Sequence, residues 1–211
     1  MAGGGWAGRR PDAPHPVVLT RGCSPALQGG ARKRIGAPLM SDATATLIPL
    51  DAIDPAEVER LLDRAFGPGR QQRTAYLIRE GMEWLPGLSF AALDEDERLV
   101  GTIQAFPVAL TDPAGRAHPL IMIGPVAVSP ERQEQGFGRA MLAAQTAAID
   151  PRAPLPQVLI GDAPYYAPFG FSAAYTAGWR CPGPWDPARL LVRCENPAIL
   201  PAEGMLGPWP G

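Results

Sequence analysis

The most apolar segment of the chain is interrupted by a residue that ordinary strands exclude. The stretch PLIMIGPVAV (119–128) carries Gly124 and Pro125 in its middle. Proline has no N–H to donate to a β-ladder, so inside a sheet it is confined to edges and bulges. A segment this apolar is expected to lie inside a sheet rather than at its edge. We therefore predict a bulge at Gly124-Pro125 that turns the strand away from a neighbour and leaves a cleft lined by unpaired backbone groups.

A glycine-rich turn follows this strand and leads into a helix. In VSPERQEQGFGRAML (128–142), Gly136 and Gly138 fall where the helix should begin, without a Ser, Thr or Asp cap. Free N–H groups at a helix N-terminus bind anions, and side chains at the two glycines would hold a phosphate away from them. The Lys-Ser/Thr of a Walker A loop and the third glycine of the dinucleotide fingerprint are missing. The turn is therefore predicted to bind a phosphate, unless its glycines serve only close packing.

The rest of the chain predicts a mixed α/β domain with one crossover connection. The stretch DPAE (54–57) has the form of a capping box with proline at the first helical position, so a helix should begin there. Its apolar face would consist of Val58, Leu61, Leu62, Ala65 and Phe66. The other expected elements are a strand at 45–50, a short helix at 74–79, strands at 88–93, 99–110 and 119–128, a helix at about 138–149, a strand at 157–160, a short helix near 163–168, and a last hairpin made by 171–177 and 188–194. The strands before the glycine turn should form an antiparallel meander, and a β-α-β unit should follow.

Residues 1–39 differ in composition from the rest of the chain. They carry six basic residues and one acidic residue, and 13 of them are Gly or Pro, whereas the remaining residues have a net charge of −7. Such a composition buries too little apolar surface to offset the entropy of ordering. We expect 1–39 to be a disordered or misannotated extension, and 40–211, which opens on Met40, to be one domain. A twin-arginine signal at Arg9-Arg10 is the alternative, but the apolar segment of about 7–15 residues that it needs is missing.

Charge and residue counts exclude several classes of partner. The net charge of −2 argues against a strongly basic nucleic-acid-binding protein, and no apolar run reaches the length of a membrane span, so neither partner is expected. The three cysteines and two histidines are Cys23, Cys181, Cys194, His15 and His118. Their spacing matches no metal site, so no metal and a reducing, cytoplasmic compartment are expected, with His118 solvated in a turn.

Three stretches of the sequence resemble the GNAT superfamily of N-acetyltransferases. PVAVSPERQEQGFGRAML (125–142) is similar to its acetyl-CoA motif, Arg/Gln-x-x-Gly-x-Gly/Ala after a strand that ends in Val-x-Pro. VLIGDAPYYAPFGF (158–171) resembles the end of the domain, and most closely a bacterial branch ending in G-D-x-x-Y-Y-x-x-F-G-F; FGPGRQQRTAYLIREG (66–81) also resembles that branch. The resemblance covers about 45–211. It implies the GNAT fold, a mostly antiparallel central sheet with a bulged, splayed strand and flanking helices.

The resemblance also implies acetyl-CoA as the cosubstrate and assigns residues to it. The binding residues would be Val126, Ala127, Val128, Gln133, Glu134, Gln135, Gly136, Phe137, Gly138 and Arg139. In the family, the backbone at Val126 and Val128 pairs with the pantetheine arm and the turn holds the pyrophosphate. Tyr166, four residues before Gly170, stands where the family has its general acid, with Tyr165 as the alternative. An amide of Val126 or Val128 would stabilise the oxyanion.

The expected function is transfer of an acetyl group from acetyl-CoA to a primary amine of a small molecule or a peptide. A catalytically silent acyl-CoA-binding module and a nucleotide-binding protein are the alternatives, and the chain could form a homodimer. The general base is not identified; Glu80, Glu83 and Asp162 are candidates. No motif names the acceptor, whose specificity should lie around 70–83 and 173–184. Trp84, Trp179 and Trp185 are candidates for the wall of its pocket.

Overall fold

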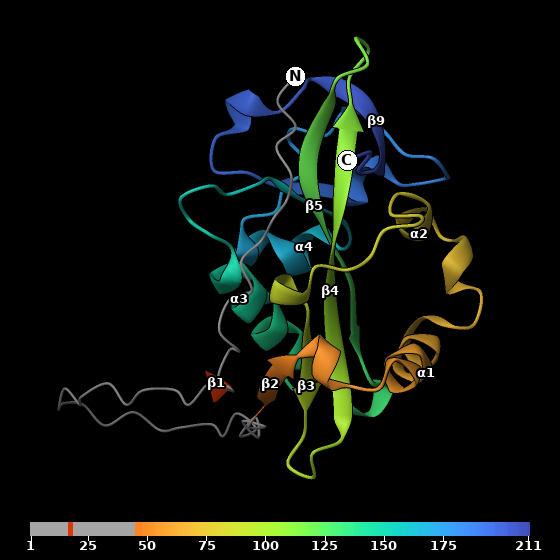
Figure 1. Ribbon diagram of the computed structural model, residues 1–211, viewed down its shortest axis with the longest axis vertical. Helices are drawn as coiled ribbons and strands as arrows, with labels where there is room; N and C mark the ends of the chain where they lie inside the picture. Colours follow the sequence, from red (N-terminus) through yellow and green to blue (C-terminus); the bar gives the residue numbers. More distant parts are fainter. Residues whose placement is uncertain (1–16, 19–44) are drawn as a thin grey trace, which may run out of the picture.

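A twisted sheet runs through the protein and carries helices on both faces (Figure 1). The computed structural model describes residues 17–18 and 45–211. Its strands are β1 (Val17–Val18), β2 (Thr46–Pro49), β3 (Phe90–Leu93), β4 (Leu99–Thr111), β5 (Ala117–Val128), β6 (Gln157–Ile160), β7 (Gly178–Arg180), β8 (Leu190–Arg193) and β9 (Glu203–Pro208). Their order is β1-β2-β3-β4-β5-β6-β8, with β9 beside the far half of β4 and β7 beside β9. The fold is the mixed α/β, mostly antiparallel arrangement that the sequence predicts.

The helices are short, and the sequence locates each of them. They are α1 (Pro55–Phe66), α2 (Thr74–Leu77), α3 (Phe137–Ala148) and α4 (Ala163–Tyr166). Asp54 caps α1, and its carboxylate accepts a hydrogen bond of 2.9 Å from the N–H of Ala56. The predicted apolar face of α1 buries Val58, Leu61 and Leu62. Helices α1 and α3 pack on β4 and β5. The side chain of Val126 packs with apolar residues of α3 and that of Ala127 with apolar residues of α1, so the two helices cover opposite faces of the sheet.

Both connections that the sequence predicts around β5 are present. Strands β3, β4 and β5 form an antiparallel meander. After β5 the chain passes through α3 and returns as β6, which pairs with β5 in parallel, so β5-α3-β6 is the crossover unit. His118 was expected in a solvated turn, which is wrong: it lies in β5, and its Nε2 atom is 2.8 Å from the carboxylate of Asp112.

The predicted last hairpin is wrong. Residues 171–177 form no strand: their backbone pairs with β8 at an isolated bridge between Ser172 and Val192, and the Thr176 hydroxyl donates to the carbonyl of Leu190. Strand β8 instead pairs with β6, and β7 pairs in parallel with β9, which the sequence did not predict. The stretch EGMLGP of β9 has two glycines and a proline and therefore a weak strand pattern. It becomes a strand because β4 offers it a partner at Val108–Thr111.

Two further sequence predictions concern the N-terminus and membranes. Apart from Val17–Val18, the predicted extension 1–39 lies outside the described residues. Within the described part of the chain, no helix is long and apolar enough to cross a membrane.

Candidate active site

The predicted bulge is present in the middle of β5. Ile103 of β4 pairs with Val126, but the next register pair is Ala105 with Ile123. Two residues of β5, Gly124 and Pro125, therefore stand opposite the single residue Gln104. The peptide bond between Gly124 and Pro125 is cis, and Gly124 has a φ of 124°, which favours glycine.

Beyond this bulge, β5 has a ladder partner on one side only. Within the described part of the chain, it pairs with β6 at Ile121 and Met122, and no pair follows. The N–H of Ser129 donates to the carbonyl of Val100 on β4 at 2.8 Å. Because N–H groups alternate in direction along a strand, those of Val126 and Val128 point away from β4, toward the side that β6 has left open. These two amides are the unpaired backbone groups that proline in this strand predicts.

A cavity of about 720 Å³ lies where β5 and β6 diverge, and we call it the cleft. One wall is the bulged part of β5, residues 122–126, and the other is the end of β6 with residues 160–162 and both tyrosines of α4. Residues 72–76 and Arg79 close it from the side of α2, and Trp185 and Arg189 from the C-terminal segment. The cleft therefore brings together the bulge and the predicted general acid, Tyr166.

Tyr166 is held on an apolar surface and keeps its proton. Its ring packs over Gly161, contacts Phe171 with ring centres 6.1 Å apart, and meets Tyr165 edge to face at 4.9 Å. Burial, followed by the neighbouring Tyr165, raises the pKa of Tyr166 to about 12, although Arg189 opposes the shift. The phenol is thus neutral throughout the physiological pH range and can only donate a proton there.

Tyr165 connects the cleft with the start of α3. Its hydroxyl oxygen lies 2.5 Å from the position that a Cβ atom on Gly138 would occupy, so a side chain there would collide with the tyrosine. Gly136 is the N-cap of α3 and has a left-handed φ of 89°, with open space where a Cβ would project. Each glycine is therefore required for a different reason: Gly136 for its left-handed backbone conformation, and Gly138 for its close packing against Tyr165. The packing alternative thus accounts for Gly138 independently of any ligand.

The turn before α3 exposes a series of backbone N–H groups. Glu134 and Gly136 both have positive φ angles, 67° and 89°. The first hydrogen bond of α3 runs from the N–H of Ala140 to the carbonyl of Gly136 at 3.0 Å. Among the described residues, no acceptor binds the N–H groups of residues 133–139. With the helix dipole behind them, these groups can bind an anion.

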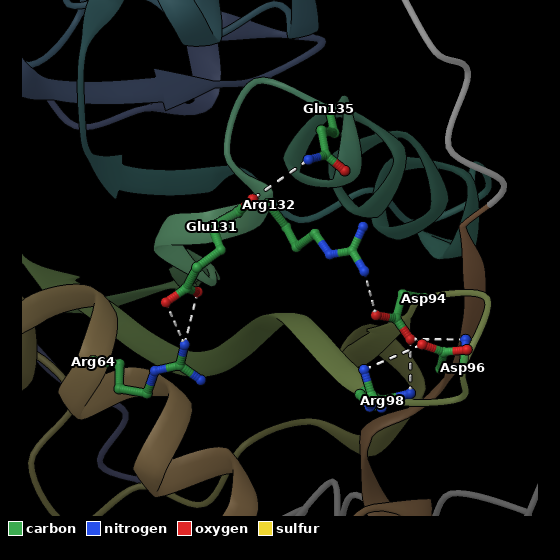
Figure 2. A network of polar contacts seen from close by, with 7 residues as sticks. All are labelled: Arg64, Asp94, Asp96, Arg98, Glu131, Arg132 and Gln135. Carbon is green, nitrogen blue, oxygen red and sulfur yellow. Dashed lines mark hydrogen bonds and ion pairs between the residues drawn. The ribbon is translucent and has the colours of Figure 1, made fainter.

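Ion pairs from two other elements hold this turn in place (Figure 2). Arg132 pairs at 2.8 Å with Asp94, which is buried in the β3–β4 turn and also accepts the N–H of Arg98. That N–H bond and, more weakly, Arg132 hold the pKa of Asp94 below its ordinary value. On the other side, both carboxylate oxygens of Glu131 accept from Arg64 of α1, at 2.8 and 2.7 Å. These contacts fix the turn and leave its N–H groups open.

The residues that the resemblance assigns to the cosubstrate occupy two adjoining places. Val126 lines the cleft, whereas residues 133–139 lie at the N-terminus of α3, next to Tyr165. Their side chains differ in exposure. Those of Ala127 and Phe137 are buried in the core, so only their backbone could meet a ligand, whereas Gln133 and Arg139 are exposed.

A second cavity of about 700 Å³, which we call the side cavity, lies between α1, α2 and β4. It shares Tyr76 and Arg79 with the cleft. Arg79 lies within 70–83, where acceptor specificity was expected, but the sequence singled out neither Arg79 nor Gln104 and did not predict the cavity. The separation of the two residues along the chain left no motif, and only the fold makes them neighbours.

Only some of the candidates for the general base and for contacts with the acceptor line one of the two cavities. Glu80 lines the side cavity and Asp162 lines the cleft, whereas Glu83 is exposed and lines neither. Trp84 lines the side cavity and Trp185 lines the cleft. Trp179 is 1% exposed, and its indole N–H donates to the carbonyl of Pro201, so it belongs to the core. Within the described residues, no cluster of His, Cys, Asp or Glu could hold a metal ion.

Comparison with known proteins identifies the family of this fold. Residues 48–174 match the family model described as an acetyltransferase (GNAT) domain. The GNAT family N-acetyltransferase YhbS from Escherichia coli, solved in complex with CoA, is 22% identical, with a TM-score of 0.57 over 83% of this chain and 94% of that one. At this identity, the likeness establishes a shared fold.

Two other solved structures are less similar. A GNAT family acetyltransferase from Brucella melitensis, solved in complex with acetyl-CoA, is 24% identical, with a TM-score of 0.43 over 72% of this chain and 97% of that one. Eis1 from Mycobacterium abscessus is 23% identical, with a TM-score of 0.45 over 62% of this chain and 31% of that one. No curated protein sequence matches the chain significantly.

Proposed function

The chain belongs to the GNAT acetyltransferase family, and from this premise we propose that it transfers the acetyl group of acetyl-CoA to a primary amine of a small molecule or a peptide. We also propose that 40–211 act as one domain in this reaction. The observation that carries the proposal is the divergence of β5 from β6 beside the uncapped start of α3. It offers one extended ligand a row of strand amides and, next to them, an anion site.

Backbone groups would hold the cosubstrate. The N–H groups of residues 133–139 suit the diphosphate, where each charge-assisted hydrogen bond contributes about 1.5–3 kcal/mol. The helix dipole adds up to about 2 kcal/mol. The outward N–H group of Val128 suits an amide carbonyl of the pantetheine arm, which would extend the open side of β5 as an added strand and leave the N–H of Val126 for the thioester oxygen. This binding mode places the thioester in the cleft near Tyr166.

The reaction needs a neutral amine, an oxyanion donor and an acid. The amine nitrogen attacks the thioester carbonyl carbon, and the N–H of Val126 stabilises the oxyanion that forms. The C–S bond then breaks, and the thiolate takes the proton of the Tyr166 hydroxyl. The new ammonium group loses one proton to solvent, and tyrosinate takes one back. Atoms and charges balance, with N-acetylated amine and free CoA as products.

The raised pKa of Tyr166 sets the energetic demand on this step. A phenol of pKa about 12 that protonates a thiolate of pKa about 8.5 works uphill by about 5 kcal/mol. The burial that raises the pKa of the phenol also destabilises the thiolate, which reduces this difference. The amine can lose its proton to water before it binds, at a cost of about 4.6 kcal/mol at neutral pH for an alkylamine. A carboxylate base is therefore not required.

Calorimetric titration of CoA into the full-length chain, with thiol release from acetyl-CoA measured against a panel of amines, tests the proposal. We expect binding of CoA and amine-dependent release of thiol. The high pKa of Tyr166 favours a second candidate, a silent acyl-CoA-binding module, which would bind CoA and release no thiol. ATP and NAD serve as ligand controls. Binding of either nucleotide in place of CoA would contradict both candidates.

A further inference from the structure

Two buried arginines lie close together near α2, and only one of them has carboxylate partners. Arg70 is 2% exposed and binds Glu59, Asp63 and the hydroxyl of Tyr76. Although burial alone would lower it, these bonds raise the pKa of Arg70 above its ordinary value. Arg79 is 6% exposed, and within the described residues no carboxylate lies at ion-pair distance from it. The charge of Arg79 is therefore buried without a counter-ion, a costly arrangement.

The guanidinium of Arg79 is fixed in orientation. It lies between two aromatic rings, 4.1 Å from the centre of Tyr76 and 4.0 Å from that of Phe106. Its Nη1 atom donates to the carbonyl of Gly124, in the bulge, at 3.0 Å. Burial, above all, lowers the pKa of Arg79 to about 10, so the group is still charged at neutral pH. Stacking and one hydrogen bond leave the rest of the planar fork available to a ligand.

The unused donors of Arg79 face the cavities. Among the described residues, the polar side-chain atoms that are fully enclosed without a partner are Thr102 Oγ1 and Arg193 Nη1. The free N–H groups of Arg79 are therefore reached from the cleft or the side cavity, both of which it lines. Its position between the two cavities would let it hold a molecule that extends from one into the other.

Gln104 adds a second unpartnered group to the same surface. It is 7% exposed, stands opposite the Gly124-Pro125 bulge, and forms no side-chain hydrogen bond with any described residue. It lies two residues from Phe106 on β4, so both side chains project from one face of the sheet. Both line the side cavity with Arg79. A buried amide without a hydrogen-bond partner, beside a buried guanidinium that uses only part of its donors, indicates a ligand with polar atoms between them.

Charge and shape restrict what this ligand can be. The guanidinium fork matches a carboxylate or a phosphate. The side cavity also carries Asp51, Glu59 and Glu80, of which Glu59 is paired with Arg70, and these acids would repel a dianion, so a single carboxylate fits better than a phosphate. The rest of its lining is mostly apolar and includes Leu50, Val58, Leu62, Met82 and Trp84. The pocket thus combines one site for a carboxylate with space for an apolar side chain.

We propose that the acceptor amine is an amino acid with a large apolar side chain, whose carboxylate binds Arg79 and Gln104 and whose side chain fills the side cavity. The inference rests on the proposed acetyl transfer. Because Arg79 contacts the bulge itself, its carboxylate partner would lie only a few bonds from the nitrogen that attacks in the cleft. That separation suits an α-amino acid.

The test compares leucine, methionine, phenylalanine and tryptophan with their carboxamides as acceptors for the full-length chain. The amine of a carboxamide is less basic, so reactivity alone favours the amide, and a preference for the acid must come from binding. We expect kcat/KM about 10- to 100-fold higher for the acids. Arg79→Gln should lower kcat/KM for the acids by that factor and leave the amides within 3-fold, and Arg79→Lys should lie between.

Controls separate recognition of the carboxylate from support of the bulge. Arg60→Gln removes an exposed arginine of α1, 64% exposed, and should change neither class of acceptor. The Kd for CoA should be the same in the Arg79→Gln variant as in the unmodified protein. Equal use of acids and amides by the unmodified protein would overturn the inference. So would an equal loss for both acceptors in Arg79→Gln, or a weakened affinity for CoA, because either would show a structural role.

A binding experiment distinguishes failure of the inference from failure of the proposed function. If the protein does not bind CoA, or binds it without releasing thiol with any amine, acetyl transfer fails. The same amino acids and carboxamides are then titrated into the protein, with CoA present where it binds. Binding of the acids alone, lost in Arg79→Gln, would still support the carboxylate site. Absence of such binding would contradict it.

Discussion

The two sides of the site differ in the chemical groups that they offer a ligand. At the start of α3 and along the outer half of β5, these groups are main-chain N–H groups, held by glycine conformation and by ion pairs around them. Around Arg79 they are side chains, a guanidinium and an amide, held by aromatic rings and by the bulge carbonyl. Apart from a change to proline, which removes one N–H, substitution cannot delete a backbone site and can only block or misplace it. A side-chain site can be removed by one substitution.

This difference has consequences for specificity. Main-chain amides bind any suitably spaced anion or carbonyl, so the first side suits a cosubstrate that many related proteins share. A charged side chain in a buried, partly apolar cavity rejects ligands that leave it unpaired, so the second side suits selection of the acceptor. Tyr166 lies in the cleft between them, and its substitution should affect neither kind of binding.

The largest effect is expected for Tyr166→Phe. Loss of the acid should lower kcat by about 10²–10⁴-fold, because the thiolate then leaves without a positioned proton. The Kd for CoA should change less than 3-fold, since phenylalanine keeps the ring contacts with Gly161 and Phe171. Steady-state thiol release and calorimetry measure the two quantities. Tyr175→Phe, at a side chain that is 50% exposed, is the matched control. A Tyr166→Phe variant with full activity would exclude the phenol as the acid.

The pH dependence of kcat/KM for the acceptor should show a rise without an alkaline fall. An acid works in its protonated form, and the pKa of Tyr166, raised to about 12, keeps the phenol protonated through the whole accessible range. The amine works in its neutral form, so the rate should increase about tenfold per pH unit until the pKa of the amine is reached. Thiol release between pH 6 and 10 measures this. A decline that begins below pH 9 would show that the working acid has an ordinary or lowered pKa.

Gly138→Ala should weaken the backbone site through Tyr165. The new Cβ atom would lie 2.5 Å from the tyrosine hydroxyl, so α4 or the start of α3 must shift. We expect the Kd for CoA to rise about 10- to 50-fold by calorimetry, with acceptor discrimination retained. The double variant Gly138→Ala with Tyr165→Phe lacks the hydroxyl and leaves the next ring atom 3.7 Å away, so it should recover most of the affinity. If the double variant binds as weakly as the single one, the collision is not the cause.

The smallest changes in the Kd for CoA are expected for the two ion pairs that hold the turn before α3, and the buried pair should matter more than the exposed one. Asp94→Ala removes a carboxylate that is 5% exposed and joins Arg132 to the β3–β4 turn, so the Kd for CoA should rise about 3- to 10-fold. Glu131→Gln weakens a pair whose side chains are 55% and 66% exposed, so the change should stay below 2-fold. Calorimetry at two salt concentrations measures both. A larger effect of Glu131→Gln would mean that the exposed pair positions the turn.

Local signals predicted most of the first side of the site. The proline in an apolar strand predicted the bulge, the glycine spacing predicted the uncapped start of α3, and the stretch DPAE predicted the start of α1. Each is a steric or hydrogen-bonding rule that acts within a few residues. The prediction of a last hairpin was wrong because the apolar pattern of its strands was compatible with more than one partner strand. Strand β8 pairs with β6, and the weakly patterned β9 completes the sheet beside β4.

The sequence by itself determined the elements whose geometry depends on near neighbours: the bulge at Gly124-Pro125, the glycine turn and the β-α-β crossover. Only the tertiary structure decided which distant side chains meet. Arg79 comes from the segment after α2, Gln104 from β4 and Tyr166 from α4, and no periodicity along the chain relates them. The physical reason is that backbone conformation is governed locally by sterics and hydrogen bonding, whereas burial and the partners of a charge depend on packing among segments far apart in sequence.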